Sequence, residues 1–245
     1  MAAVPPSAAA IASAGVAVVV MPAEDAVGAD TPRPAPDASS WEGPVAGCVF
    51  CHADQTPGRL TTTANLRLVP DLYPVAPGHL LVITKRHLLS YGAAEPALLD
   101  EVERLAGRAR RFVRDVYGID PVIWENGVSG QTVFHAHLHL IPVHLEGLIE
   151  SLAGDPASVE IDGWDAVAER YRSHGGYHYA ALGDRRWLLE SNGAMNWEVR
   201  RLIAVSAGLR YLDGRWVRPT SNYDVEAAQD RWREWSSADL SPASG

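Results

Sequence analysis

The stretch "GQTVFHAHLHLIPVH", residues 130–144, decides how the rest of the chain is interpreted. It places histidines at every second position, His135, His137 and His139, with Ala and Leu between them. Side chains on a β-strand alternate between two faces, so the three imidazoles are expected to share one face. The intervening apolar side chains then share the other face and can enter a core. Three polar rings in a row need hydrogen bonds or a metal ion, because buried polar groups without partners are costly.

A turn precedes this strand, with the sequence Glu-Asn-Gly-Val-Ser-Gly-Gln-Thr over residues 125–132. Its glycines and small polar residues can bring backbone N–H groups close to an anion. Three interpretations of the histidines compete: a three-histidine metal site, a histidine nucleophile with two supporting imidazoles, and histidines that merely lie on a partly exposed strand face.

Phosphorus chemistry favours the second interpretation. A neutral imidazole can attack an α-phosphorus and form a covalent nucleotidyl-histidine, provided that its other nitrogen donates to a fixed carbonyl. The charge that develops on the phosphoryl oxygens needs donors that are already in place. Gln131, Thr132, the turn backbone and a flanking histidine can supply them.

The composition restricts the class of protein. The chain has 245 residues, 47% of them hydrophobic, which is enough for one ordinary domain with extensions or for two small domains. A formal net charge of −9 argues against a broad basic surface for nucleic acid. The two cysteines, Cys48 and Cys51, are three residues apart, which argues against a disulfide scaffold. No apolar run reaches the roughly 18–20 residues of a membrane span.

The first 46 residues are expected to be a disordered Ala/Pro-rich tail and linker. The apolar segment 8–23 resembles the core of a signal peptide, but no Lys or Arg precedes it, and the first is Arg33. We therefore expect no secretory signal and a cytoplasmic protein.

The pattern from residue 47 predicts an α+β fold with a mainly antiparallel sheet. Strands are expected over 64–71, 79–84 and 121–126, followed by the histidine strand. Apolar spacings of three and four predict a helix over 96–118, with Pro96 in its first turn and Gly118 as its stop. The arginines of this helix alternate with acidic residues, which indicates an exposed face rather than a groove for nucleic acid.

Beyond residue 150 the pattern changes and predicts a C-terminal α+β extension. Helices are expected over 160–173, 194–209 and 224–235, and a hairpin over 175–191 that turns at Gly183-Asp184. His174 and His178 are interpreted as surface or hairpin residues rather than ligands. Four tryptophans are interpreted as core or covering residues: Trp187, Trp197, Trp216 and Trp232. Residues 236–245 are expected to be disordered.

Three segments resemble the histidine triad (HIT) family. They are the triad "GQTVFHAHLHLIP", the upstream "DLYPVAPGHLLVITKRH" of residues 71–87, and "CVFC" of residues 48–51, which resembles the entry of the family's zinc-containing branch. The resemblance covers about residues 47–145 in the expected order. It implies a HIT-like fold, in which a long helix packs on an antiparallel sheet, over residues 47–149. Residues 150–235 are then an extension packed on or beside this domain.

The resemblance also implies roles for individual residues. His137 matches the nucleophile that takes up the nucleotidyl group, and His139 matches the phosphate-contacting third histidine. The implied substrate contacts are Asp71, which binds ribose, His79, Asn126, Gln131 and Thr132. The implied ligands of a structural Zn²⁺ are Cys48, Cys51, His87 and His135. Without zinc, His135 would instead belong to the catalytic hydrogen-bond network around His137.

Two departures from the family pattern stand out. Asn126 occupies the place of a His in the Glu-His-Gly turn of other branches, and Thr84 replaces a common Pro. Neither change touches the expected nucleophile.

The expected function is that of a nucleotidyl hydrolase or transferase acting at the α-phosphate of a nucleotide conjugate. Hydrolysis is the default, because water is always present, and transfer to a sugar phosphate or phosphorolysis in a specialised biosynthetic pathway is the close rival. Two further alternatives remain open: a non-catalytic nucleotide-binding module, and a zinc hydrolase whose ligands are all three triad histidines. Neither nucleic acid nor membrane is expected as a partner. A homodimer is expected, because members of the family commonly pair.

Overall fold

The structure is a computed structural model, and it describes residues 44–52, 58–72, 74–129, 131–143, 158–189, 210–212, 215–217 and 225–239. Residues 1–43 of the predicted tail and linker, which was expected over 1–46, lie outside these residues, as does the predicted helix over 194–209. Among the described residues, none of the helices combines the length and apolar character needed to cross a membrane.

The core of the fold is an eight-stranded sheet in the order β1-β2-β3-β5-β4-β7-β8-β6, with every neighbouring pair antiparallel. The strands are β1 Thr61–Thr62, β2 Leu66–Pro70, β3 Leu80–Thr84, β4 Val122–Glu125, β5 His137–Ile141, β6 Ser158–Glu160, β7 His178–Leu182 and β8 Arg185–Leu189. A separate two-stranded sheet pairs β9 Arg210–Leu212 with β10 Arg215–Val217. The predicted α+β class is confirmed.

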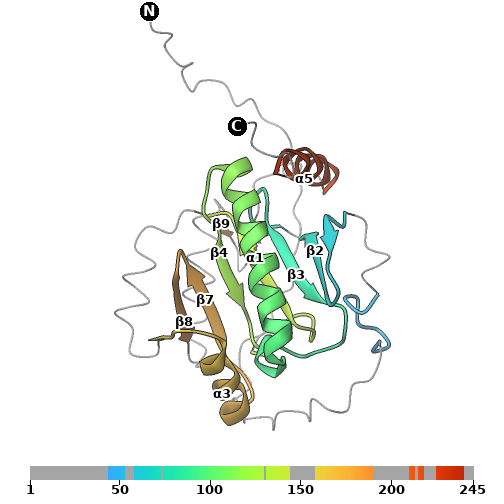
Figure 1. Ribbon diagram of the computed structural model, residues 1–245. Helices are drawn as coiled ribbons and strands as arrows, with labels where there is room; N and C mark the ends of the chain where they lie inside the picture. Colours follow the sequence, from blue (N-terminus) through green and yellow to red (C-terminus); the bar gives the residue numbers. More distant parts are fainter. Residues whose placement is uncertain are drawn as a thin grey trace, which may run out of the picture.

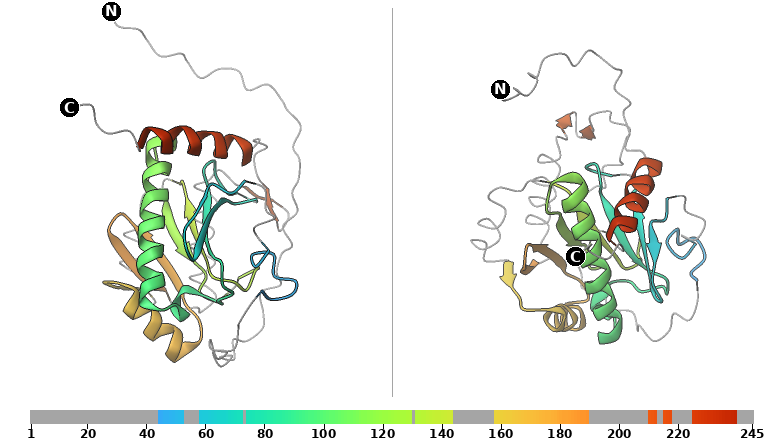
Figure 2. Two further views of the ribbon diagram at one scale, coloured as in Figure 1. Left: turned by 45° about the vertical axis from the view of Figure 1, so that its right-hand side comes forward. Right: turned by 45° about the horizontal axis from the view of Figure 1, so that its top comes forward.

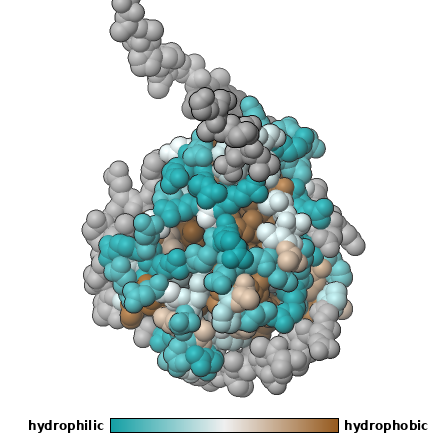
Figure 3. All heavy atoms as spheres, viewed as in Figure 1, coloured by the Kyte–Doolittle hydropathy of each residue, from teal (hydrophilic) through white to brown (hydrophobic). Residues whose placement is uncertain are grey.

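Helix α1, Pro96–Tyr117, packs across one face of the sheet (Figure 1). The helix begins at Pro96, and it ends where Gly118 adopts the left-handed conformation, as the sequence predicts. Its buried side chains, such as Val102 and Ala109, join the apolar residues of β2, β3 and β5 in the main core. The outer surface over α1 is mainly hydrophilic (Figure 3). On this helix, the guanidinium group of Arg108 lies over the rings of Trp232 and Trp235.

The strand that follows the triad turn alternates as predicted. Ala136, Leu138 and Leu140 enter the core beneath α1, while His137 and His139 lie opposite Ile83 and Leu81 of β3, on the other face. One detail of the prediction is wrong, because β5 begins at His137 and His135 precedes it. The N–H group of Ala136 donates to the carbonyl of Leu88, so it takes no part in the regular hydrogen bonding between strands.

Residues 158–189 extend the same sheet. Strand β7 pairs with β4, and β8 and β6 follow outward. The hairpin turn at Gly183 is as predicted, with a φ of 59°. The predicted start of the preceding helix is wrong: residues 158–160 pair with β8, so helix α3 covers only Trp164–His174. Helix α3 packs against the short 3₁₀ helix η3, Tyr91–Ala93. In Figure 1, α3 lies near the start of α1.

Helix α5, Val225–Asp239, crosses the C-terminal end of α1 (Figure 2). Its Trp232 is buried and meets Phe112 edge-on, with ring centroids 5.0 Å apart. The Nε1–H group of Trp235 donates to Asp115 at 3.0 Å. The predicted helix therefore exists, but it continues four residues into the segment predicted to be disordered.

Candidate functional site

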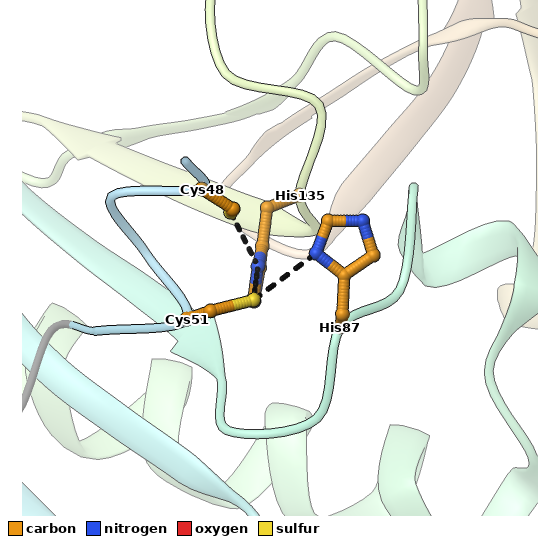
Figure 4. Close-up of side chains that lie close together, drawn as sticks. All are labelled: Cys48, Cys51, His87 and His135. Atoms are coloured by element: carbon orange, nitrogen blue, oxygen red, sulfur yellow. Dashed lines mark hydrogen bonds between the residues drawn. The ribbon is translucent and has the colours of Figure 1, made fainter. Parts of the chain in front are cut away.

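The first cluster of the site consists of Cys48, Cys51, His87 and His135 (Figure 4). The cysteines come from a turn before β1, His87 from the loop after β3, and His135 from the residues before β5. The Sγ of Cys51 lies 3.2 Å from Nδ1 of His87 and 3.6 Å from Nδ1 of His135, and the Sγ of Cys48 lies 3.4 Å from the same Nδ1 of His135. The four donor atoms all lie within 4.8 Å of one another.

These distances fit a tetrahedral zinc ion. Bond lengths of about 2.3 Å to sulfur and 2.0–2.1 Å to nitrogen give a sulfur–nitrogen separation of about 3.5 Å. Both histidines point Nδ1 inward, and burial lowers their pKa, that of His135 to about 4, which favours the neutral imidazole that a metal requires. Burial raises the pKa of the Cys51 thiol, so a cation is needed to favour the thiolate.

Thr84 fixes the ring of His135 from behind. The Nε2 atom of His135 lies 2.8 Å from the carbonyl oxygen of Thr84 and 3.0 Å from its hydroxyl. A proton on Nε2 satisfies both acceptors and leaves Nδ1 with a lone pair that points at the cysteines. The sequence does not reveal this role, because the register that brings residue 84 beside residue 135 is a long-range property.

The second cluster consists of Asp71, His79 and His139. The N–H group of Val75 donates to Nδ1 of His79 at 3.2 Å, so the proton of a neutral His79 lies on Nε2. That Nε2 lies 3.0 Å from Nδ1 of His139, and the Asp71 carboxylate lies 3.8 Å from the same Nδ1. A neutral His139 then carries its own proton on Nε2, as a donor for a ligand.

His137 lies between the two clusters. Its Nδ1 is 2.6 Å from the carbonyl oxygen of His135, so Nδ1 carries a proton and Nε2 keeps a lone pair. Its ring meets that of His139 at a centroid distance of 4.9 Å and that of Phe50 at 5.1 Å. Burial lowers the pKa of His137, which favours the neutral ring. Phe50, which the sequence analysis did not single out, thus links the cysteine turn to the centre of the triad.

The three turn residues that were expected to contact substrate have different surroundings. The carboxamide nitrogen of Gln131 donates to the carbonyl of Leu89 at 3.1 Å, whereas Thr132 is exposed. Asn126 is buried, and its Oδ1 accepts from the indole N–H of Trp124 at 3.0 Å. The side chains of Gln131 and Asn126 therefore make hydrogen bonds within the protein.

His178 lies in the hairpin strand β7, which is one of the two positions expected for it. It is fully buried there and stacks on Trp124 with centroids 5.4 Å apart, whereas His174 is exposed. Within the described part of the chain, two groups can hold a metal ion, and neither contains all three triad histidines, which contradicts a three-histidine zinc centre.

The other predicted tryptophans divide in two. Trp187 and Trp232 are buried, as expected of core residues. Trp197 and the side chain of Trp216 lie outside the described residues.

Comparison with known proteins gives the class. The model of the HIT domain family matches residues 56–145. An uncharacterized HIT-like protein of Mycoplasma genitalium is 31% identical over 109 residues, which cover 42% of this chain and 77% of that protein. An uncharacterized HIT-like protein of Chlamydia trachomatis is 36% identical over 116 residues, which cover 44% of this chain and 96% of that protein. The chain belongs to the HIT family.

A solved structure is also similar in sequence. A zinc-bound histidine triad family protein from Mycobacterium smegmatis is 26% identical, with a TM-score of 0.37, over 52% of this chain and 92% of that one. The interpretation of the cysteine cluster rests on the distances given above rather than on this similarity.

Proposed function

We propose that the protein is a nucleotidyl hydrolase or transferase that acts at the α-phosphate of a nucleotide conjugate, with His137 as the nucleophile. The observation that supports this most strongly is the bond from Nδ1 of His137 to the carbonyl of His135, which leaves the Nε2 lone pair free. A buried, neutral imidazole with a fixed tautomer is what attack on phosphorus requires.

In the first step, Nε2 of His137 attacks the α-phosphorus, the bond from phosphorus to the leaving-group oxygen breaks, and that oxygen takes the electron pair. The Nε2–H group of His139 can stabilise the developing charge. In the second step, the oxygen of water or of another acceptor attacks phosphorus and gives its proton to the departed leaving-group oxygen or to solvent, while the P–N bond breaks and its electron pair returns to Nε2 of His137. The carboxylate of Asp71, which lies beside His139, would bind a ribose hydroxyl.

We propose that the cysteine cluster holds a structural Zn²⁺. Two thiolates and two imidazoles form a closed ligand set without an open position for water. The ion would tie the cysteine turn to the loop after β3 and to the start of the triad, and so keep the His135 carbonyl in place for His137.

The test is mass spectrometry of protein quenched during turnover of a panel of dinucleotides, nucleotide sugars and nucleoside phosphoramidates. The expected result is a nucleotidyl adduct on His137, whose mass identifies the nucleotide. In His137→Ala the adduct should vanish and turnover should fall by about 10³- to 10⁶-fold. His174→Ala, which removes an exposed histidine on α3, should behave like the wild type.

Two outcomes would reject the proposal. One is an adduct on another residue, or turnover that survives in His137→Ala. The other is a wild type that binds nucleotides but turns over no conjugate of the panel, which would identify a binding module. Hydrolysis and transfer share the first step, so the products formed with and without added phosphate or sugar phosphate distinguish them.

A further inference from the structure

The turn over residues 126–132 is held by a part of the chain that lies outside the family match. The N–H group of Tyr177 donates to the carbonyl of Gly127 at 3.1 Å, and Val128 forms a parallel bridge with Tyr177. Ser129 is just as close, since a Cβ on Gly176 would lie 2.6 Å from its Oγ. The residues before β7 therefore lie directly against the turn.

The turn needs such support because its backbone is strained. Val128 has a φ of 79°, a left-handed conformation that β-branched residues rarely adopt. A residue in such a region costs on the order of 1–3 kcal/mol and persists only when its surroundings impose it. The bridge to Tyr177 is a contact that imposes it.

The side chain of Tyr177 reaches a second segment of the site. Its ring is fully buried between two glycines, since a Cβ on Gly127 or Gly92 would lie 2.6 or 2.7 Å from ring carbons. Its hydroxyl donates to Oε2 of Glu125 at 2.6 Å and accepts from the N–H group of Gly92 at 2.8 Å. One side chain thus joins the end of β4 to the residues around η3.

The residues around η3 in turn contact both ends of the turn. Oε1 of Glu125 accepts from the N–H group of Tyr91 at 2.8 Å. The carbonyl of Leu89 accepts from Gln131, and that of Leu88 accepts from Ala136, next to the triad histidines. Hydrogen bonds therefore connect the segment 88–92 to both ends of the turn, and Tyr177 lies at the centre of this network.

We infer that Tyr177 is a positioning residue, which holds the turn 126–132 in the geometry needed to receive the phosphates of the substrate. It acts through Gly127, Val128 and Glu125. The inference rests on the proposed function, because it takes this turn as the part of the site that meets the phosphates. A purely structural tyrosine would stabilise the fold without any specific effect on the turn.

The experiment uses the full-length, zinc-loaded protein and two matched pairs of variants. Tyr177→Phe removes only the hydroxyl, and its control is Tyr179→Phe, another buried tyrosine two residues along, which stacks on Trp164. Gly176→Ala pushes Ser129 without touching the hydroxyl network. Its control is Gly163→Ala, where a Cβ meets no atom within 4 Å.

We expect kcat/KM for the substrate found by the adduct screen to fall by about 10- to 100-fold in Tyr177→Phe and Gly176→Ala, because small displacements of a positioned group are costly. The two controls should stay within about threefold. Hydrogen–deuterium exchange of peptides covering 126–134 should rise in Tyr177→Phe but not in Tyr179→Phe, with unchanged zinc content in both.

Equal kinetics and equal exchange in the two tyrosine variants would overturn the inference. If Tyr177→Phe does not fold, Gly176→Ala decides: kinetics like those of Gly163→Ala would reject a positioned turn. If the wild type turns over no conjugate, the proposed function fails. The exchange measurement still decides whether Tyr177 holds the turn, so the two failures can be distinguished.

Discussion

His135 and His139 lie on either side of His137 and carry the same side chain, yet the structure gives them opposite surroundings. His135 is fully buried, and its Nδ1 points at two sulfur atoms. The side chain of His139 is 18% exposed, and its Nδ1 meets an imidazole and a carboxylate. The role of a histidine is therefore set by what lies across from it rather than by its place in the motif.

The cluster around His135 is closed to solvent and the cluster around His139 is partly open, and this difference has a chemical consequence. Soft thiolates in a closed cluster select zinc and leave no position for a substrate. An Asp-His-His group at a partly open position instead orients a proton donor toward the solvent side, where an anionic ligand can arrive. Variants at the two ends test this division between a structural end and a reactive end of the triad.

The largest effect is expected from removal of both sulfur ligands. Cys48→Ser combined with Cys51→Ser should reduce zinc from about one ion per chain to none, measured by plasma mass spectrometry. Unfolding by urea should show a loss of several kcal/mol, because structural zinc binding contributes about 10–16 kcal/mol to folding in small zinc domains.

The matched control is Asp71→Asn, at the open end of the triad. It should retain the full zinc content and the wild-type unfolding midpoint within error. Zinc retained in the double cysteine variant, or lost in Asp71→Asn, would contradict the division between the two clusters.

A smaller effect, on catalysis alone, is expected at His139. His139→Leu fills much of the same space but has no N–H group to donate. It should lower kcat/KM by about 10²- to 10³-fold, as the loss of a charge-stabilising donor does elsewhere. Zinc content should not change. A variant with wild-type turnover, or one that loses zinc, would show that the two ends are not separate.

Local spacing in the sequence indicates only part of each cluster, and the resemblance to the HIT family implied the remaining members. A period of two places the triad rings on one face, and a spacing of three brings Cys48 and Cys51 together in one turn. Helix α1 is equally local, since its apolar spacing, its first proline and its final glycine all lie within its own residues.

What the sequence does not reveal is long-range pairing. Nothing local to Thr84 indicates that it bonds to His135, and nothing in the hairpin of β7 and β8 names β4 as its partner strand. For the same reason the burial of His178 within the predicted hairpin becomes evident only when β7 is placed beside Trp124. The extension expected on or beside the HIT domain is, in residues 158–189, a continuation of the sheet.

The pH dependence of stability needs its own test, because the ionisable Glu125 lies on the opposite face of the sheet from the triad. Burial raises the pKa of Glu125 from 4.5 to about 7. The groups that interact with it are four tyrosines, Tyr91, Tyr171, Tyr177 and Tyr179, whose pKa values are all raised, so no charge among them compensates the carboxylate. Ionised Glu125 therefore destabilises the fold.

The sign follows from the raised pKa. The folded state binds the proton more tightly than the unfolded state, so stability is lost as the pH rises from about 4.5 to about 7. Between pH 5 and pH 8 the wild type should lose roughly 2–3 kcal/mol more than Glu125→Gln, measured by urea unfolding. Glu234→Gln, an exposed control on α5, should follow the wild type. Parallel curves for the wild type and Glu125→Gln would show that Glu125 does not titrate in this range.

The smallest effect is expected at the group behind His135. Thr84→Val removes the hydroxyl that lies 3.0 Å from Nε2 of His135 but keeps the backbone carbonyl at 2.8 Å. Loss of an outer partner of a metal ligand commonly weakens binding by about 10- to 100-fold. Because the carbonyl stays, we expect the zinc dissociation constant, measured by competition with a chelator, to rise by only about 2- to 10-fold.

Thr62→Val is the matched control, since it makes the same change at an exposed position of β1 and should leave zinc affinity unchanged. Equal affinity in Thr84→Val and Thr62→Val would mean that the carbonyl alone orients His135. A fall in turnover without any change in zinc affinity would instead mean that Thr84 acts on His137. In that case the closed end of the triad would not be purely structural, and the contrast between His135 and His139 would have to be redrawn.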